Sequence, residues 1–160
     1  MIVGAGGHGQ VVKEIVEVTK RYEFIDFVDD KNSEVVGKVQ DLSILREKYG
    51  AALVSIGNNQ LRGRILEELK RLDYEVPVMI HPSAYISKSC RIGDGTIVEP
   101  MAVINANSVI AEGCIISPGA IVDHDVTMGN YVHINSGAVV KAGSRVESYT
   151  KVDAGTVYGN

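Results

Sequence analysis

The sequence has 160 residues, of which 45% are hydrophobic and 22% charged, the balance of a globular protein with one ordinary domain or two small ones. Its net charge of -4 gives a nucleic-acid partner no electrostatic support, and no apolar run approaches the ~20 residues that span a bilayer. Two cysteines without Cys-x-x-Cys spacing, and no secretory signal, indicate a reducing compartment, so we expect a cytoplasmic protein.

Short apolar runs alternate with helical spacing through the first eighty residues. Apolar residues at helical spacing predict helices over residues 8–20 and 61–72, and Asp41 is placed to cap a short helix between them. The alternation is typical of βαβ units, so we expect a short Rossmann-like parallel sheet in an α/β domain of residues 1–81. The expected strands of this sheet are residues 1–3, 24–28, 51–56 and 76–80.

From Tyr85 onward the pattern changes to a repeat of six residues. The recurring aliphatic positions are Ile86, Ile92, Val98, Ile104, Ile110, Ile116, Val122, Met128, Ile134, Val140, Val146 and Val152. A small or β-branched residue follows each of them four positions later, including Cys90 and Cys114, which we interpret as core fillers. Uninterrupted self-similarity at a fixed period predicts a solenoid.

Six residues form a short strand and a turn, and three such faces close a triangular coil of eighteen residues. Aliphatic side chains then fill the prism, and successive coils stack about 4.8 Å apart. We expect residues 82–160 to form a parallel β-helix of four coils. Its open ends need covers: the N-terminal domain is expected to cap one end, and the stop at Asn160 indicates either truncation or another cover at the other.

The first strand leads into a glycine-rich turn that opens a helix and fits G-x-G-x-x-G. Such a turn exposes helix N–H groups to a phosphate, and two aspartates about twenty residues later can reach a ribose hydroxyl. Glycine-rich and solvated turns without a ligand are the alternative interpretations. The residues concerned are Gly4, Gly6, Gly7, His8, Gly9, Asp29 and Asp30.

A second polar loop follows the third expected strand and therefore faces the same edge of the sheet. It contains Gly57, Asn58 and Asn59. Arg62, at the start of the next helix, is placed either to meet a phosphate or to form a surface ion pair.

His124 is the strongest candidate for catalysis, because it lies off the inward positions and between two carboxylates, Asp123 and Asp125. Stacking by eighteen puts the small residues Ala106 and Ala142 below and above it, which leaves the imidazole uncrowded. A carboxylate orients an imidazole and raises its basicity, and the sequence leaves open which aspartate does so. A surface histidine among acids is the plainer alternative.

Two other histidines in this half are less distinctive. His133 precedes the inward Ile134 and is either a second site residue or a corner histidine. His81, next to Pro82 at the domain boundary, is expected to be structural.

Together these segments resemble the sialic acid O-acetyltransferase and UDP-amino-sugar N-acetyltransferase family of left-handed β-helix sugar acyltransferases. The segments that carry the resemblance, in matching order and spacing, are residues 2–9, Asp29-Asp30, residues 56–59 with Arg62, residues 80–83, residues 122–125 and residues 133–138. The left hand of the helix comes from this resemblance, since the spacing does not determine it.

The resemblance implies an acetyl-CoA-dependent acetyltransferase acting on a nucleotide-linked sugar or sialic acid by direct transfer. It implies a homotrimer with active sites between neighbouring prisms, and a UDP-sugar on the N-terminal domain with His8 near the sugar or cofactor. His124 would be the general base and Asp125 its orienting carboxylate. His133, Ala142 and Gly143 would line the CoA site, with the Ala142 N–H as oxyanion donor.

The sequence departs from the family pattern at three points. Ser117 stands where Asn is common, Ala142 stands where Gly is common, and most members continue beyond the equivalent of Asn160, so we expect CoA binding to be weaker. Nitrogen or oxygen acylation, the sugar and the acyl length stay open.

Three other functions compete with this interpretation. A carbonic-anhydrase-like metal site would need three convergent histidines, but His124 and His133 are half a coil apart and no third histidine follows, so we expect no metal. A nicotinamide oxidoreductase would explain only the glycine motif. A non-enzymatic nucleotide-sugar-binding or assembly module with a truncated β-helix is the main alternative, and acetyl-CoA binding separates it from the transferase.

Overall fold

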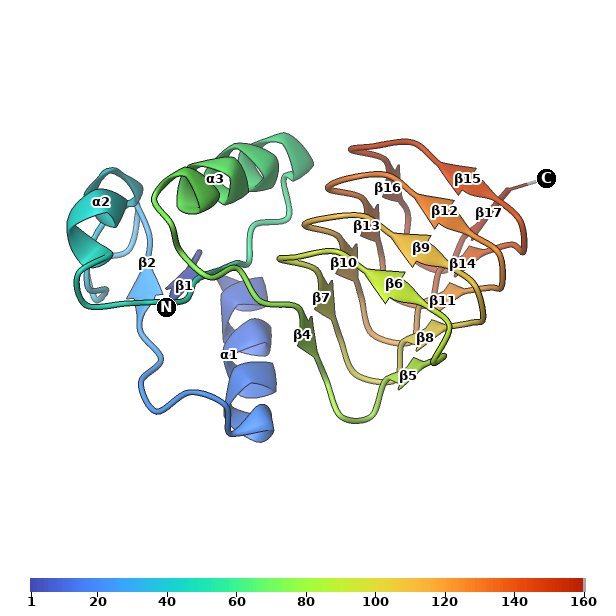
Figure 1. The fold of residues 1–160 in the computed structure, drawn as a ribbon, viewed down its shortest axis with the longest axis horizontal. Coiled ribbons are helices and arrows are strands. Elements are labelled where there is room, and N and C mark those ends of the chain that lie inside the picture. Colours follow the sequence, from blue (N-terminus) through green and yellow to red (C-terminus); the bar gives the residue numbers. More distant parts are fainter. Residues whose placement is uncertain (160) are drawn as a thin grey trace. The chain divides into compact units, whose positions relative to one another are not determined.

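The computed structural model describes residues 1–159, which divide into two compact units at Pro77 and Val78. The first unit is an α/β unit and the second a parallel β-helix (Figure 1).

The N-terminal unit has a three-stranded parallel sheet in the order β2-β1-β3. Its strands are β1 (Ile2–Val3), β2 (Phe27–Val28) and β3 (Leu53–Val54). Its helices are α1 (Gly7–Thr19), the 3-10 helix η1 (Val39–Asp41), α2 (Leu42–Leu45) and α3 (Asn59–Arg71). The predicted alternation of strands and helices is confirmed, although each strand is shorter than its apolar run.

Helix α1 buries Val12, Ile15 and Val16, one stripe at helical spacing, whereas Val18 is 48% exposed and does not belong to the expected apolar face. Asp41 immediately precedes α2 but does not cap it with its side chain. Its Oδ2 accepts instead from the Lys38 N–H at 2.9 Å, and so caps the preceding 3-10 turn.

The prediction that residues 76–80 form a fourth strand of this sheet is wrong. The segment forms β4 (Met79–Ile80), which pairs with β7 of the β-helix through Met79 N–H to Thr96 O and His81 N–H to Val98 O, both 2.9 Å. Ile80 lies six residues before Ile86 and extends the hexad pattern backwards. A short apolar run looks alike in both settings, so only its register with Ile86 reveals where it belongs.

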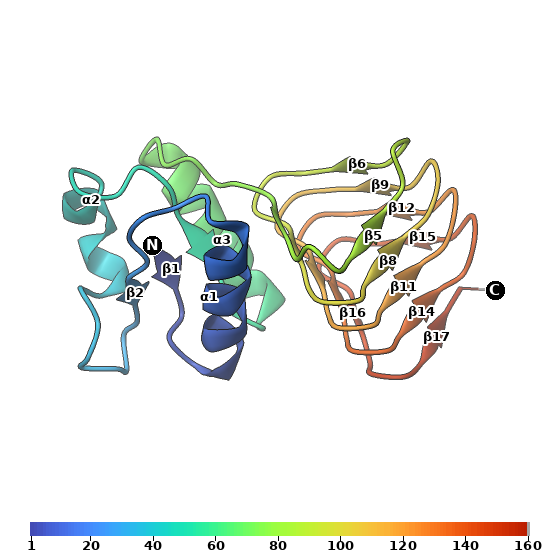
Figure 2. The same ribbon diagram turned by 90° about the horizontal axis from the view of Figure 1, so that it is seen from below.

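The β-helix is built from two-residue strands whose partners lie eighteen residues apart, as in Ile116↔Ile134 and Val122↔Val140. Its three faces are the sheets β16-β13-β10-β7-β4, β17-β14-β11-β8-β5 and β15-β12-β9-β6, which Figure 2 shows as stacked rows. Besides β4, the strands are β5 (Tyr85–Ile86), β6 (Arg91–Ile92), β7 (Ile97–Val98), β8 (Val103–Ile104), β9 (Val109–Ile110), β10 (Ile115–Ile116), β11 (Ile121–Val122), β12 (Thr127–Met128), β13 (His133–Ile134), β14 (Val139–Val140), β15 (Arg145–Val146), β16 (Lys151–Val152) and β17 (Val157–Tyr158).

The hexad aliphatic residues form one continuous core, with Ile104, Ile116, Val122 and Ile134 fully buried. Cys114 is also fully buried, and its Sγ contacts the Gly129 carbonyl at 3.3 Å, which confirms that it fills the core. The stacking rule therefore fixes which turns lie above one another, and this positions the candidate site.

Candidate functional site

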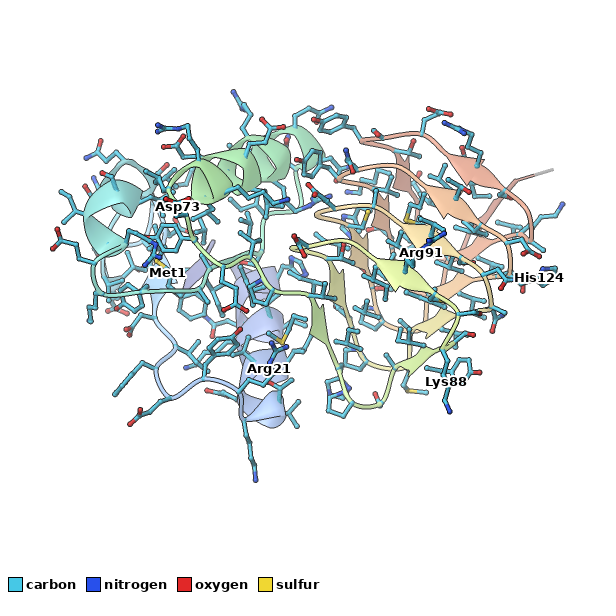
Figure 3. The ribbon with its side chains drawn as sticks, in the orientation of Figure 1. Met1, Arg21, Asp73, Lys88, Arg91 and His124 are labelled. Carbon is cyan, nitrogen blue, oxygen red and sulfur yellow. The ribbon has the colours of Figure 1, made fainter. Side chains whose placement is uncertain are left out.

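His124 lies in the turn between β11 and β12, after the inward Val122 has fixed that strand in the core. The turn closes at Asp125, whose φ of 58° is left-handed, a conformation that Asp tolerates better than most residues. In Figure 3 the His124 side chain points away from the β-helix. The imidazole is 57% exposed and so accessible to a ligand.

Asp125 is the aspartate that contacts the ring. Its Oδ2 lies 2.7 Å from His124 Nδ1, while Asp123 Oδ1 accepts from the His124 main-chain N–H at 2.8 Å. An ionised carboxylate only accepts hydrogen bonds, so Nδ1 carries the proton and the neutral ring keeps its lone pair on Nε2. The bond raises the pKa of His124 and lowers that of Asp125. The result is an oriented imidazole of increased basicity.

The next coil brings Ala142 and Gly143 beside His124, as predicted from stacking. The Gly143 N–H donates to the His124 carbonyl at 2.9 Å, whereas the Ala142 N–H makes no hydrogen bond within residues 1–159. Ala142 and Gly143 also line an open hollow of about 500 Å³, together with Ser144, Arg145, Tyr158 and Gly159. A main-chain donor and a ligand-sized hollow thus lie one coil beyond the imidazole.

His133 lies on a different face of the prism. It belongs to β13, in the sheet of β10 and β16, whereas His124 follows β11, which belongs to the sheet of β8 and β14. Its Nε2 lies 3.1 Å from Ser117 Oγ, and the ring is half-buried. The structure therefore does not bring His133 into the corner of His124 within one chain.

Sequence reasoning missed two asparagines below this corner. Asn107 Nδ2 donates to Asp125 Oδ1, and Asn105 Nδ2 donates to Asp123 Oδ1, both at 3.1 Å. The signal for both was present, because each asparagine precedes its aspartate by the eighteen residues of one coil.

In the N-terminal unit, the glycine-rich turn is held by a carboxylate. The Ala5 N–H donates to Asp29 Oδ2 at 2.8 Å, and the Lys31 N–H donates to Asp29 Oδ1 at 2.8 Å, which together lower the pKa of Asp29. Gly4 has a φ of +109°, and a Cβ on Gly9 would lie 2.1 Å from the Gly4 carbonyl oxygen. Both glycines are therefore required by the turn itself.

A cavity of about 270 Å³ opens at this edge of the sheet. Its lining includes Gly4, Asp29 and Asp30 of the predicted site, with Val3, Val28, Lys31, Val39, Ile56, Leu61 and Ile65. Gly6 and Gly7 lie at the N-terminus of α1 with open space where a side chain would stand. His8 Nδ1 lies 3.1 Å from the Ser55 carbonyl oxygen. The cavity thus combines an apolar lining with carboxylates. At the N-terminus of α1, no side chain blocks access to the main chain of Gly6 and Gly7.

The loop after β3 uses its polar side chains internally. Asn58 Oδ1 accepts from the Leu61 N–H at 2.9 Å and caps α3, while Asn59 Oδ1 accepts from Arg62 Nη2 at 2.8 Å. Arg62 has no exposed surface and also donates from Nη1 to the Ile56 carbonyl at 2.9 Å. Both expectations for Arg62, a phosphate contact and a surface ion pair, are wrong. Gly57 is exposed and has open space around its Cα.

Residues 1–159 contain no group of three or more His, Cys, Asp or Glu side chains arranged to hold a metal ion. Over the same residues, no helix has both the length and the apolar character needed to cross a membrane.

Comparison with known proteins identifies both units. The PglD N-terminal domain model matches residues 1–69, and the bacterial transferase hexapeptide model, of six repeats, matches residues 107–142. UDP-N-acetylbacillosamine N-acetyltransferase of Bacillus subtilis (strain 168) is 32% identical over 106 residues, 61% of this chain and 49% of that protein. The chain thus spans about half the length of this curated relative.

Solved structures match the whole chain. The acetyltransferase domain of PglB from Neisseria gonorrhoeae FA1090 is 35% identical, with a TM-score of 0.93 over 98% of this chain and 80% of that chain. The same domain is known in complex with acetyl coenzyme A. PerB from Caulobacter crescentus, in complex with CoA and GDP-perosamine, is 29% identical with a TM-score of 0.83, over 99% of this chain and 87% of that chain. The chain therefore belongs to the hexapeptide-repeat sugar acyltransferases with a left-handed β-helix, as its sequence predicts.

Proposed function

We propose that this protein transfers an acetyl group from acetyl-CoA to the amine of a nucleotide-linked amino sugar, with His124 as general base and Asp125 as its orienting carboxylate. The observation that carries the proposal is the 2.7 Å contact between His124 Nδ1 and Asp125 Oδ2 at an exposed corner. It leaves Nε2 as the acceptor for a proton from the attacking amine.

The corner supports direct transfer. As the amine nitrogen attacks the thioester carbon, Nε2 removes its proton, and the Ala142 N–H is available to the developing oxyanion. Collapse of this intermediate breaks the C–S bond, and the imidazolium returns the proton to the departing CoA sulfur. Base catalysis of this kind contributes about 10²–10⁴-fold. Cys114 is buried and Cys90 Sγ contacts the Asn105 carbonyl at 2.9 Å, so neither favours a covalent intermediate.

The relatives support both substrates. The PglB domain binds acetyl-CoA, PerB binds CoA and GDP-perosamine, and the Bacillus subtilis relative is named for a UDP-sugar. The 500 Å³ hollow beside Ala142 is suited to part of the CoA, and the 270 Å³ cavity beside Asp29 and Asp30 to part of the nucleotide sugar. Gly6 and Gly7 allow a phosphate to approach the N-terminus of α1.

A homotrimer is part of the proposal, and one face of the β-helix supports self-association. The outward residue of every strand in the sheet β17-β14-β11-β8-β5 is apolar, with Ile121 37% and Val157 65% exposed. These residues are Tyr85, Val103, Ile121, Val139 and Val157. Strand β11 of this face leads directly to His124, so a second copy on it would lie beside the base. Sedimentation equilibrium measures the assembly, and a monomer at assay concentration would contradict this part.

The test is release of free CoA thiol from acetyl-CoA with a panel of UDP- and GDP-linked amino sugars and sialic acids. We expect release with an amino sugar, and a fall of about 100-fold or more for His124→Ala. His81→Ala is the matched control, because this histidine contacts Ser83 within its own turn and should leave the rate unchanged.

Three other outcomes would contradict parts of the proposal. Release that survives His124→Ala rejects the base but keeps the enzyme. Release with sialic acid alone rejects the amine acceptor. Nucleotide-sugar binding without acetyl-CoA binding or release supports a non-enzymatic binding module.

A further inference from the structure

We infer that Asn107 is a positioning residue, which holds the Asp125 carboxylate in the orientation that binds the His124 ring. The inference rests on the proposed function for its consequence in catalysis, but the contact itself is independent of it. Asn107 lies one coil below Asp125 and donates a hydrogen bond to its carboxylate.

Both oxygens of Asp125 are engaged, each by a different side chain. Oδ1 accepts from Asn107 Nδ2 at 3.1 Å, and Oδ2 lies 2.7 Å from His124 Nδ1. The Asp125 side chain is 54% exposed, so without Asn107 its carboxylate is free to rotate toward water. When Asn107 holds Oδ1 of Asp125, Oδ2 is kept oriented toward the His124 ring. This contact fixes the proton on Nδ1 and leaves Nε2 as the base.

The main chain explains why an asparagine can stand here. Asn107, Asp125 and Gly143 occupy the same corner in successive coils, with φ of 61°, 58° and 69°. Asn and Asp tolerate this left-handed region, and the Asn107 N–H is held by Ser89 Oγ at 2.9 Å. Gly143 has no side chain to offer from above, so Asn107 supplies the second partner of Asp125.

A second pair two residues away serves as an internal comparison. Asn105 Nδ2 donates to Asp123 Oδ1 at the same 3.1 Å, but that oxygen accepts from the main-chain N–H of His124 instead of contacting the ring. The two pairs share their chemistry and their spacing along the chain. Only the aspartate that Asn107 binds, Asp125, contacts the imidazole of His124.

The charges acting on His124 within residues 1–159 are Asp123 and Asp125, and both raise its pKa. The hydrogen bond that His124 donates to Asp125 is nevertheless the first cause of the shift, ahead of either charge. Losing the orientation of Asp125 should therefore lower the pKa of His124 even though the charge stays nearby. This separates positioning from simple electrostatics.

The experiment compares Asn107→Gly with Asn105→Ala in the full chain. Glycine keeps the left-handed corner, as Gly143 does one coil later, and removes the side chain with its amide donor. We expect Asn107→Gly to lower kcat about tenfold, a part of what the base contributes, with KM for acetyl-CoA unchanged. Asn105→Ala should stay within about twofold of wild type. A third variant, Asn107→Asp, fits the same corner but cannot donate, so it should lose kcat as well.

The readout independent of activity is the NMR titration of the His124 ring, which is resolvable because the chain has four histidines. We expect its midpoint to move to lower pH in Asn107→Gly and to stay in place in Asn105→Ala. An unchanged midpoint in Asn107→Gly overturns the inference, as does wild-type kcat in Asn107→Asp. A shifted midpoint in a protein that acetylates no sugar would reject the proposed function and keep the positioning role.

Discussion

Two polar side chains after β3, Asn59 and Arg62, turn inward in the N-terminal unit, whereas those of the corner between β11 and β12 stay exposed. Arg62 is completely buried and bonded to Asn59, while His124 is 57% exposed and bonded to Asp125. Asn59 and Arg62 use their side-chain hydrogen bonds to hold the loop after β3. His124 keeps a ring nitrogen for a reacting molecule, which is why we propose that the β-helix carries out the chemistry and that the N-terminal unit holds a ligand.

The largest loss of stability is expected when the buried arginine is removed, as in Arg62→Ala. It removes the guanidinium donors to the Ile56 carbonyl and the Asn59 amide oxygen and opens a cavity in the interior, so the free energy of unfolding should fall by about 3 kcal/mol or more. Arg64→Ala, on the exposed side of the same helix, should stay within about 0.5 kcal/mol. Urea unfolding measures both. If Arg62→Ala left the stability unchanged but lost affinity for the nucleotide sugar, Arg62 would instead contact a phosphate of the ligand.

A smaller loss of stability is expected from Gly9→Ala. Its new methyl group would lie 2.1 Å from the Gly4 carbonyl oxygen, and moving this main chain should cost about 1–3 kcal/mol. Gly7→Ala is the matched control in the same helix, because its methyl group meets no atom within 4 Å, and we expect a change within about 0.5 kcal/mol. Thermal unfolding followed by circular dichroism distinguishes the two. Equal melting temperatures would show that the turn relaxes without strain.

Prediction from sequence succeeded best where geometry repeats. The hexad rule located the β-helix core, and stacking by eighteen correctly set Ala142 beside His124. The same rule also places Asn107 below Asp125 and aligns the apolar column through Ile121, although residues eighteen apart do not look like neighbours when the sequence is read along the chain. In the α/β unit no such period exists. Whether Arg62 points inward depends on how α3 packs, which its spacing does not specify.

The pH dependence of catalysis sharpens the assignment of roles at the corner. The proposed base works as neutral imidazole, so log kcat/KM should fall as pH drops through the pKa of His124, which Asp125 holds above its usual 6.5. Asp125→Asn removes the first cause of that shift, so the acidic limb should move to lower pH. Asp123→Asn should move it less, because Asp123 acts on the ring only through its charge. A larger displacement in Asp123→Asn would reverse the two roles.

The smallest expected effect concerns Asp29, the carboxylate that ties the glycine-rich turn in the N-terminal unit. Main-chain N–H groups of Ala5 and Lys31 lower the pKa of Asp29 below its ordinary 3.8. Because the folded-state pKa is depressed, the stabilisation is fully present above the unfolded value and is lost as pH falls through the folded one. Wild type should therefore exceed Asp29→Asn in unfolding free energy at pH 7 and 5, and the gap should narrow below about pH 4.

Urea titrations of the two proteins at matched pH values follow that gap. Asp153→Asn, at an exposed aspartate of the β-helix, is measured beside them as the control for the loss of one surface carboxylate. A gap that stays constant into acid would mean that Asp29 supports the turn through shape alone. The charge on its carboxylate would then be available to a ligand in the adjoining cavity, and the N-terminal unit would resemble the His124 corner more closely than its buried Arg62 suggests.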